Sequence, residues 1–218
     1  MSCQTRGTEE TLGNGPVAGP TVRPVIGNVY PKYATRNPIA RYLMHGFLSA
    51  AGELYDSTAA KTVLEVGCGE GELASRLVRR GSRPERFVAC DLDLSRVKDD
   101  PLITYQCASA YALPYKDGEF DLVVCCEVLE HLDDPAAAIH EIARVSKKAA
   151  LISVPWEPVW RFANVARGRY LSRFGNTPGH VQHFSRSDIR LLVGGKLSIL
   201  NERRPFPWTM LLCAKASL

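Results

Sequence analysis

The stretch VLEVGCGEG, Val63 to Gly71, identifies the fold class of this chain. Its apolar start predicts a buried strand, and three glycines follow at every second position: Gly67, Gly69 and Gly71. Glycine at such places permits a tight turn and lets a ligand approach the backbone closely. The G-x-G-x-G spacing differs from the G-x-G-x-x-G of dinucleotide-binding folds. The stretch therefore predicts a strand, a glycine-rich loop that can bind a ligand, and a helix.

Two acidic residues strengthen the prediction that this loop binds a ligand. Glu65 lies on the strand itself, and Asp91 ends the next predicted strand, RFVACD. In α/β folds a carboxylate at that second position holds ribose hydroxyls. A plain connecting turn is the alternative for the glycines alone, and it accounts for neither acid.

The rest of the chain alternates short apolar runs with helical patterns, which predicts an α/β fold with a parallel sheet covered by helices on both faces. Strands are expected in LITYQC, FDLVVCC and AALISVP. Helices are expected after Asn37-Pro38 (apolar face Ile39, Leu43, Phe47, Ala51 and Leu54), over Leu73–Val78 with Gly81 as the C′ residue, after Asp134-Pro135, and over Ser185–Val193. The last two runs, KLSILNE and WTMLLCAKA, predict an antiparallel pair at the edge of the sheet.

Length and composition fit one soluble domain. The chain has 218 residues, is 45% hydrophobic and 23% charged, and carries a net charge of +4. We expect a disordered tail over residues 1–24 and a single domain over residues 25–218. We expect neither a signal peptide nor a membrane span. The seven cysteines include no C-x-x-C pair, which favours reduced thiols in a cytoplasmic protein.

Four segments together resemble a known family. VLEVGCGEGE, VACDLD, ALPYKDGEFDLVVCCEVLEHLDDP and LISVP resemble, in this order, the motifs of class I S-adenosylmethionine-dependent methyltransferases, of the type 11-like subgroup that acts on small molecules. The resemblance covers residues 60 to 155. It implies a Rossmann-like, doubly wound sheet of seven strands with the last strand antiparallel, and S-adenosyl-L-methionine as the cofactor.

The resemblance also implies which residues bind the cofactor. The glycine loop lies at its methionine and ribose part, Asp91 holds the ribose hydroxyls, and later positions line the adenine and the methyl group. The implied set is Glu65, Gly67, Cys68, Gly69, Gly71, Asp91, Leu92, Ser109, Ala110, Cys126 and Glu127. The family often has Asp where this chain has Ser109, so a weaker hydrogen bond to the adenine amino group is expected there.

Methyl transfer is a direct displacement that requires alignment of the reacting atoms and exclusion of water. A base is needed only if the nucleophile arrives protonated, and it must lie near the carboxyl ends of the fourth and fifth strands. The candidates here are His131 and Glu127, with a structural role left open for His131. Glu130 is expected to face solvent or the loop, and His45 and His140 are expected on solvated helix faces.

A long segment, residues 156–184, separates the fifth strand from the next helix. It is rich in arginine and aromatic residues, and no acid occurs from Pro158 to Ser187. Two interpretations stay open: a solvated basic helix, or a lid whose arginines meet an anionic substrate. The substrate-binding candidates are Trp156, Arg161 and Arg169 and, from an N-terminal helical cap over residues 25–58, Tyr30 and Tyr33.

The same segment contains GNTPGHVQHF, with His180 and His183 three residues apart. A zinc or iron site needs three or four ligands, and no cysteine or well-placed acid completes a set, so no metal is expected. Both histidines are therefore candidates for a base or a hydrogen-bonding group on the substrate side, with simple solvation as the alternative.

The leading hypothesis is a cytoplasmic methyltransferase that acts on O, N or C of a small metabolite, anionic if the lid interpretation holds, such as a precursor of a secondary metabolite, sugar or lipid. One alternative is a nucleic-acid methyltransferase, which the mild charge and the absence of an N-P-P-[YF] motif disfavour. Another is a protein of the same fold that binds the cofactor without transferring a methyl group. No membrane partner is expected, and the oligomeric state is not determined by these patterns.

Overall fold

The computed structural model describes residues 35–81, 83–157, 159 and 181–215. The predicted tail at residues 1–24, the first part of the predicted cap and most of the 156–184 segment lie outside the described residues. The elements in chain order are α1 (Pro38–Asp56), β1 (Thr62–Val66), α2 (Glu72–Leu77), β2 (Arg86–Asp91), β3 (Thr104–Cys107), β4 (Phe120–Cys126), the 3₁₀ turn η1 (Leu129–His131), α3 (Pro135–Val145), β5 (Ser146–Pro155), α5 (Arg186–Gly194), β6 (Leu197–Arg203) and β7 (Trp208–Lys215).

The seven strands form one sheet in the order β3-β2-β1-β4-β5-β7-β6. The first five strands in this order pair in parallel, so that Leu64 of β1 lies between Val88 of β2 and Val123 of β4. β7 runs antiparallel to both of its neighbours, with Met210 opposite Ser153 of β5. The doubly wound, Rossmann-like sheet with an antiparallel last strand is confirmed.

The carboxyl ends of β1, β2, β4 and β5 lie at one edge of the sheet, because these strands run in the same direction. The chain order reverses between β1 and β4, and α/β folds bind their ligands at such a switch point. β7 begins at this same edge, since its first residue, Trp208, pairs with Pro155 at the end of β5. The short connection between β6 and β7 therefore also borders the candidate site.

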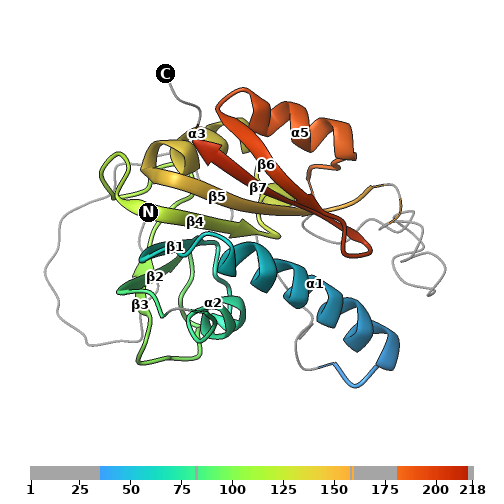
Figure 1. Ribbon diagram of the computed structural model, residues 1–218, viewed down its shortest axis with the longest axis horizontal. Helices are drawn as coiled ribbons and strands as arrows, with labels where there is room; N and C mark the ends of the chain where they lie inside the picture. The colour runs from blue at the N-terminus through green and yellow to red at the C-terminus, as the bar shows by residue number, and fades with distance from the viewer. Residues whose placement is uncertain (1–34, 82, 158, 160–180, 216–218) are drawn as a thin grey trace, which may run out of the picture.

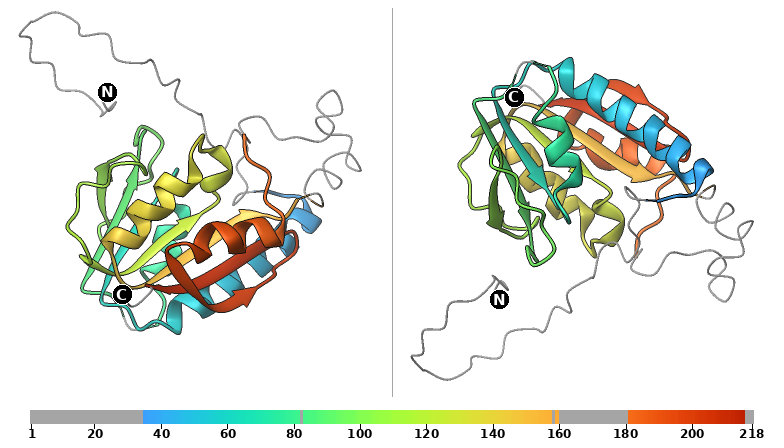
Figure 2. Two further views of the ribbon diagram at one scale, coloured as in Figure 1. Left: turned by 90° about the horizontal axis from the view of Figure 1, so that it is seen from above. Right: turned by 90° about the horizontal axis from the view of Figure 1, so that it is seen from below.

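Helices cover both faces of the sheet. Figure 1 shows α1 and α2 on one side and α3 and α5 on the other, and both views of Figure 2 agree. Two buried clusters correspond to these layers: one joins Phe47, Leu54 and Leu77 to the sheet, and the other joins Ile142 and Ile189 to the opposite face. Each face is buried by apolar helix residues, as the strand–helix alternation predicts.

The helices begin where their capping residues predict. Asn37 accepts hydrogen bonds from the N–H groups of Ile39 and Ala40, and Asp134 accepts one from Ala137. Ser185 opens α5 with a reciprocal capping box.

Two local expectations about helices are wrong. Ile39 is 67% exposed, so the predicted apolar face of α1 is buried only from its second turn onward. α2 ends at Leu77 with Val78 as its C-cap, so Gly81, three residues farther on with φ +51°, belongs to the following turn.

The cysteines are mostly buried thiols. Five of the described ones are free and buried: Cys68, Cys90, Cys125, Cys126 and Cys213. Burial raises the pKa of Cys90 and Cys213 to about 12, which keeps these thiols protonated and unreactive. Cys107 is disulfide-bonded, so the prediction of reduced thiols fails at that position. Within the described residues, no helix is long and apolar enough to cross a membrane.

The interaction between Asp100 and Arg79 is expected to make the folded protein less stable in acid. Its side chain is 5% exposed and accepts hydrogen bonds from the Arg79 guanidinium and, at 2.7 Å, from the Ser75 hydroxyl. The bonded guanidinium, more than the opposing effect of burial, lowers the pKa of Asp100 from 3.8 to about 2. The stabilisation is therefore present above pH 4 and is lost as the pH falls toward 2.

We expect the free energy of unfolding to drop by about 1–2 kcal/mol over this pH interval. This is less than the pKa shift alone would give, because solvent around the half-exposed Arg79 screens the interaction. Urea titrations of the wild type and Asp100→Asn between pH 2 and 5 measure it. Asp99→Asn, at the exposed neighbouring carboxylate, is the control and should keep the wild-type pH dependence. An equally steep decline in Asp100→Asn contradicts the assignment.

Candidate functional site

The glycine loop after β1 bonds to the end of β2. The backbone N–H groups of Gly67 and Cys68 both donate to the carbonyl of Cys90, at 2.8 and 3.0 Å. All three glycines have positive φ: +75° at Gly67, +56° at Gly69 and +78° at Gly71. A Cβ at Gly67 or Gly71 would overlap a neighbouring side chain, whereas a Cβ at Gly69 would meet nothing within 4 Å. The backbone at Gly69 therefore borders open space that a ligand can enter.

Asp91 lies next to that open space. One of its carboxylate oxygens accepts the N–H of Gly69 at 2.8 Å, and the other accepts the N–H of Asp93 at 3.3 Å. The side chain is only partly buried, so lone pairs remain for ligand hydroxyls. Leu92 follows with 39% exposure, an apolar surface beside the carboxylate. The glycine backbone and the carboxylate fit the ribose of a nucleoside, and the apolar side chain fits its base.

The loop after β3 forms a further wall of the site. The N–H of Ala108 donates to the carbonyl of Asp91 at 3.0 Å, which holds Ser109 and Ala110 beside the end of β2. The Ser109 hydroxyl oxygen accepts the N–H of Tyr111 at 3.2 Å. One of the two lone pairs of that hydroxyl oxygen is therefore used within the loop, and the second lone pair and the O–H remain for a ligand.

Glu65 and Cys68 lie inside the site rather than at its surface. Glu65 is 3% exposed on β1, between Ala89 of β2 and Val124 of β4. Cys68 is 7% exposed, and burial, followed by the nearby charges of Glu65 and Asp91, raises its thiol pKa well above the usual range. The protonated Cys68 can line a ligand pocket but supplies no thiolate.

Glu127 follows β4 in a backbone conformation that side chains rarely adopt, with φ +61°. Its N–H donates to the carbonyl of Ser153 on β5 at 3.1 Å. Its carboxylate accepts the indole N–H of Trp208 at 2.7 Å and, more weakly, the Ser153 hydroxyl at 3.4 Å. Such strain is found where surrounding structure holds a functional group in place. Cys126, just before it, is 9% exposed and faces the same layer as α1.

Trp208 contacts the candidate residue Glu127, a neighbour that the sequence analysis did not predict. It is 4% exposed, and its ring contacts that of Phe47 in α1, with centroids 5.1 Å apart at 59°. A buried indole usually needs a hydrogen-bond acceptor, which Glu127 provides. In the sequence, a tryptophan at the start of an apolar strand suggests a buried indole that needs an acceptor. The sequence pattern does not identify that acceptor, because it lies 81 residues away.

The turn η1 lies beneath the end of the 156–184 segment. The carbonyl of Glu130 accepts the N–H groups of Val181 and Gln182 at 2.9 and 3.0 Å. Glu130 is 1% exposed, so the expectation that it faces solvent is wrong, whereas the alternative that it faces the loop agrees with the returning chain that covers it. His131 is partly buried, with Nε2 4.0 Å from a Glu130 carboxylate oxygen. His45 and His140 are exposed on α1 and α3, as expected.

The two described ends of the 156–184 segment meet at the carboxyl edge of the sheet. Glu157 donates its N–H to the carbonyl of Phe184 at 3.0 Å, and His183 Nδ1 lies 3.7 Å from the Glu157 carboxylate. The backbone N–H of Trp156 donates to the carbonyl of Pro207, and the Arg186 guanidinium covers the Trp156 ring, 3.6 Å from its centroid. Five candidates lie outside the described residues: Tyr30, Tyr33, Arg161, Arg169 and His180. In the described part, no group of three or more side chains could hold a metal ion.

Comparison with known proteins agrees with this geometry. Residues 64–154 match the model of a methyltransferase domain. A ubiquinone biosynthesis O-methyltransferase of Pseudomonas paraeruginosa is 33% identical over 100 residues, which are 41% of this chain and 41% of that protein. The chain thus aligns with about four tenths of the length of this curated relative.

Solved structures share the whole fold at lower identity. A magnesium protoporphyrin IX methyltransferase from Synechocystis, crystallised with S-adenosylhomocysteine, has a TM-score of 0.62 and 17% identity, over 84% of this chain and 89% of that one. The 4+2 cyclase SpnF has a TM-score of 0.57 and 17% identity, over 78% and 82%. Residues 64–154 of the chain therefore match a methyltransferase domain, and the predicted resemblance to class I S-adenosylmethionine-dependent methyltransferases is confirmed over this stretch.

Proposed function

We propose that the protein transfers a methyl group from S-adenosylmethionine to O, N or C of a small molecule. The observation that carries this proposal is the open space at Gly69, where the backbone and the Asp91 carboxylate meet at the switch point of the sheet. A nucleoside fits that arrangement, and Glu127 lies at the end of the adjacent strand, where an acceptor would enter.

Each of the site's residues has a role in this proposal. The bound cofactor supplies an electrophilic methyl group on a sulfonium. Asp91 accepts hydrogen bonds from the ribose hydroxyls, and the backbone at Gly69 closes against the ligand. Glu127, held by Trp208 and Ser153, orients the acceptor or accepts its proton. His131 and His183 are the alternative bases.

Two measurements test the proposal. Calorimetry should show one S-adenosylhomocysteine site per chain, with an affinity in the micromolar range. Incubation of a metabolite extract with isotopically labelled S-adenosylmethionine should then yield a labelled product that mass spectrometry identifies. Cofactor binding without any labelled product would favour a protein of this fold that does not transfer methyl groups. The similar structure of SpnF, a protein named as a cyclase, is the reason to test this alternative. Labelling of RNA or DNA instead would favour the nucleic-acid alternative.

Two finer statements belong to the same proposal. We infer an anionic acceptor from the arginine-rich 156–184 segment, in which no acid accompanies the arginines between Pro158 and Ser187. We infer a cytoplasmic location from the five buried free thiols, with Cys107 as the exception.

A further inference from the structure

Residues 181–184 cross from the end of β4 to the end of β5. The N–H groups of the first two of these residues donate to the carbonyl of Glu130 in η1, at 2.9 and 3.0 Å. At the other end, the carbonyl of Phe184 accepts the N–H of Glu157, which follows β5, at 3.0 Å. His183 lies between these two attachments. It is therefore located at the carboxyl edge of the sheet, beside the strand ends where an acceptor would enter.

Glu157 and His183 form a close pair at this edge. The carboxylate oxygen Oε1 of Glu157 lies 3.7 Å from Nδ1 of His183, and the exposed fraction is 9% for the acid side chain and 36% for the imidazole. The distance exceeds that of a hydrogen bond, and such pairs at catalytic sites often shorten only when the substrate binds. A carboxylate beside one nitrogen of an imidazole selects the tautomer and leaves the other nitrogen with its lone pair. Nε2 of His183 is thus the atom that can accept a proton.

Contacts of the neighbouring residues hold both members of the pair. Phe184, directly after His183, is 7% exposed and packs into the apolar core. Trp156, directly before Glu157, donates its N–H to the connection between β6 and β7 at 2.9 Å, and the Arg186 guanidinium covers its ring. The backbone is therefore fixed on both sides of the contact, which places the imidazole before any ligand binds.

The other two candidate bases are already engaged or less accessible. The Glu127 carboxylate accepts the Trp208 indole N–H at 2.7 Å and a hydroxyl of β5 at 3.4 Å. These bonds fix the carboxylate, which suits a group that orients the acceptor. The His131 side chain is 18% exposed, and its Nε2 lies 4.0 Å from the buried Glu130 carboxylate. Of the two imidazoles at this edge, that of His183 is the one more open to an acceptor.

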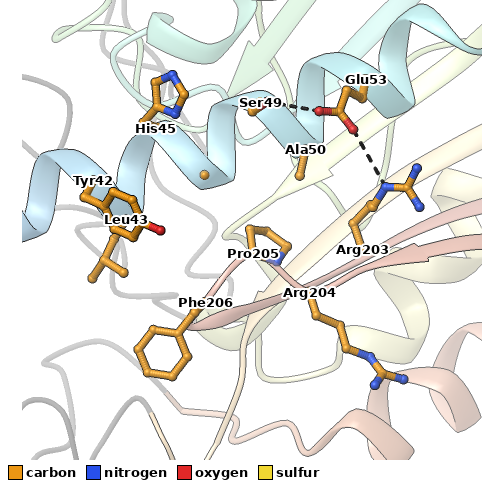
Figure 3. Close-up of a pocket in the computed structure, with 11 residues that line it drawn as sticks. Tyr42, Leu43, His45, Ser49, Ala50, Glu53, Arg203, Arg204, Pro205 and Phe206 are labelled. Atoms are coloured by element: carbon orange, nitrogen blue, oxygen red, sulfur yellow. Dashed lines mark hydrogen bonds and ion pairs between the residues drawn. The ribbon is translucent and has the colours of Figure 1, made fainter.

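A pocket of about 500 Å³ lies between α1 and the connection from β6 to β7 (Figure 3) and offers no comparable group. His45, the histidine among its described lining residues, points away from this connection. The buried rings of Phe47 and Trp208, 5.1 Å apart, separate the pocket from Glu127. A proton acceptor for the proposed reaction is therefore expected at the ends of β4 and β5 and not in this pocket.

We propose that His183 is the base that takes the proton of the acceptor, and that Glu157 is a positioning residue that holds its imidazole. The acceptor is then a small molecule whose methylated atom carries a weakly acidic proton, as the hydroxyl group of a phenol or an alcohol does. This role rests on the proposed methyltransferase function, whereas the pairing of Glu157 with His183 does not.

The transfer is balanced as follows for a hydroxyl acceptor. A lone pair of the acceptor oxygen forms the bond to the methyl carbon, and the carbon–sulfur bond breaks with its electron pair kept by sulfur. The hydroxyl proton moves to Nε2 of His183, and the resulting imidazolium releases a proton to solvent, which reaches the partly exposed ring. Glu127 orients the acceptor during this step.

Nitrogen-15 NMR of the histidine-labelled full chain tests the pairing without any ligand. In alkaline buffer, where an imidazole is neutral, His183 should be the Nδ1–H tautomer, because that proton points to Glu157. Its resonances are assigned by their loss in His183→Gln. Glu157→Gln keeps an acceptor oxygen and should keep this tautomer, whereas Glu157→Met has none and should change it to Nε2–H. An Nε2–H tautomer in the wild type, or an unchanged tautomer in Glu157→Met, overturns the pairing.

The labelled-extract assay tests the role as base. His183→Gln should lower the yield of labelled product about 100-fold, the usual contribution of a positioned base. Glu157→Met should lower it about tenfold, and Glu157→Gln by less, because the amide oxygen still orients the ring. Imidazole added to the buffer should restore product in His183→Ala, since it can occupy the vacated space and take the proton. A yield in His183→Gln within threefold of the wild type, or no restoration by imidazole, overturns the role as base.

His140→Gln is the matched control, since His140 is an exposed histidine on α3. It should give the wild-type yield, and all of these variants should bind S-adenosylhomocysteine within about threefold of the wild type. If the wild type neither binds S-adenosylhomocysteine nor yields labelled product, the proposed function fails and the role as base fails with it, while NMR still decides the pairing. If the wild type yields product and His183→Gln yields as much, the role as base fails alone.

Discussion

Asp91→Ala is expected to weaken S-adenosylhomocysteine binding about 100-fold, since two hydrogen bonds from ligand hydroxyls to a charged acceptor are lost. The same carboxylate bonds to Gly69 and Asp93, so its removal also loosens the loop that would close on the ligand. Calorimetry measures the affinity, and thermal unfolding measures whether the fold persists. Asp91→Asn keeps an oxygen acceptor but no charge, so its affinity for S-adenosylhomocysteine should lie between that of Asp91→Ala and that of the wild type.

Asp93→Ala provides the control for that experiment. Asp93 is an exposed carboxylate two residues farther along, and its side chain bonds the N–H of Ser95 at 2.8 Å. Its removal should leave the affinity within about threefold of the wild type, as is usual for surface substitutions. Equal affinity of Asp91→Ala and the wild type would refute the nucleoside site, and equal losses in both variants would point to local unfolding.

Glu127→Gly is expected to reduce labelled product about 100-fold, the usual contribution of a positioned acid or base. Glycine suits the positive φ at this position, so the backbone strain is relieved rather than increased. The loss of the carboxylate leaves the Trp208 indole without its acceptor, which offsets part of that gain. The melting temperature should therefore stay near that of the wild type, and S-adenosylhomocysteine should still bind.

Trp208→Phe separates the positioning of Glu127 from its chemistry. Phenylalanine keeps an aromatic ring against Phe47 but donates no hydrogen bond to Glu127. Product should fall about tenfold, less than in Glu127→Gly, because the carboxylate remains but is held less firmly. Product yield in Glu127→Gly within threefold of the wild type would exclude a catalytic role and leave His131 and His183 as candidates.

The strand-and-loop core of the site could be predicted because its signals are local. Val63 to Gly71 contains an apolar run and three glycines, and the structure gives each of these glycines a positive φ. Asp91 ends β2 as expected, and the parallel register brings it to Gly69 at 2.8 Å. Such features depend on backbone sterics and on strand direction, and both are visible over a few residues.

The wrong predictions of exposure concern residues whose burial depends on segments far away in the sequence. Glu130 was expected to face solvent or the loop, and solvent does not reach it because Val181 and Gln182 return to cover it. Ile39 was expected in the core because it fits the helical period, and no residue in the described part of the chain packs against the first turn of α1 closely enough to bury it. Periodicity states which face is apolar and not how far the neighbouring element extends.

The resemblance to methyltransferases follows from four short segments within residues 60 to 155, and the glycine loop and the acidic residue after the second strand are each specified within about ten positions. Tertiary structure decided the rest. The insertion of β7 between β5 and β6 brings Trp208 to Glu127 and places the β6–β7 connection beside α1. Those contacts join segments far apart in the chain, and side-chain packing after folding selects them; no local preference encodes them.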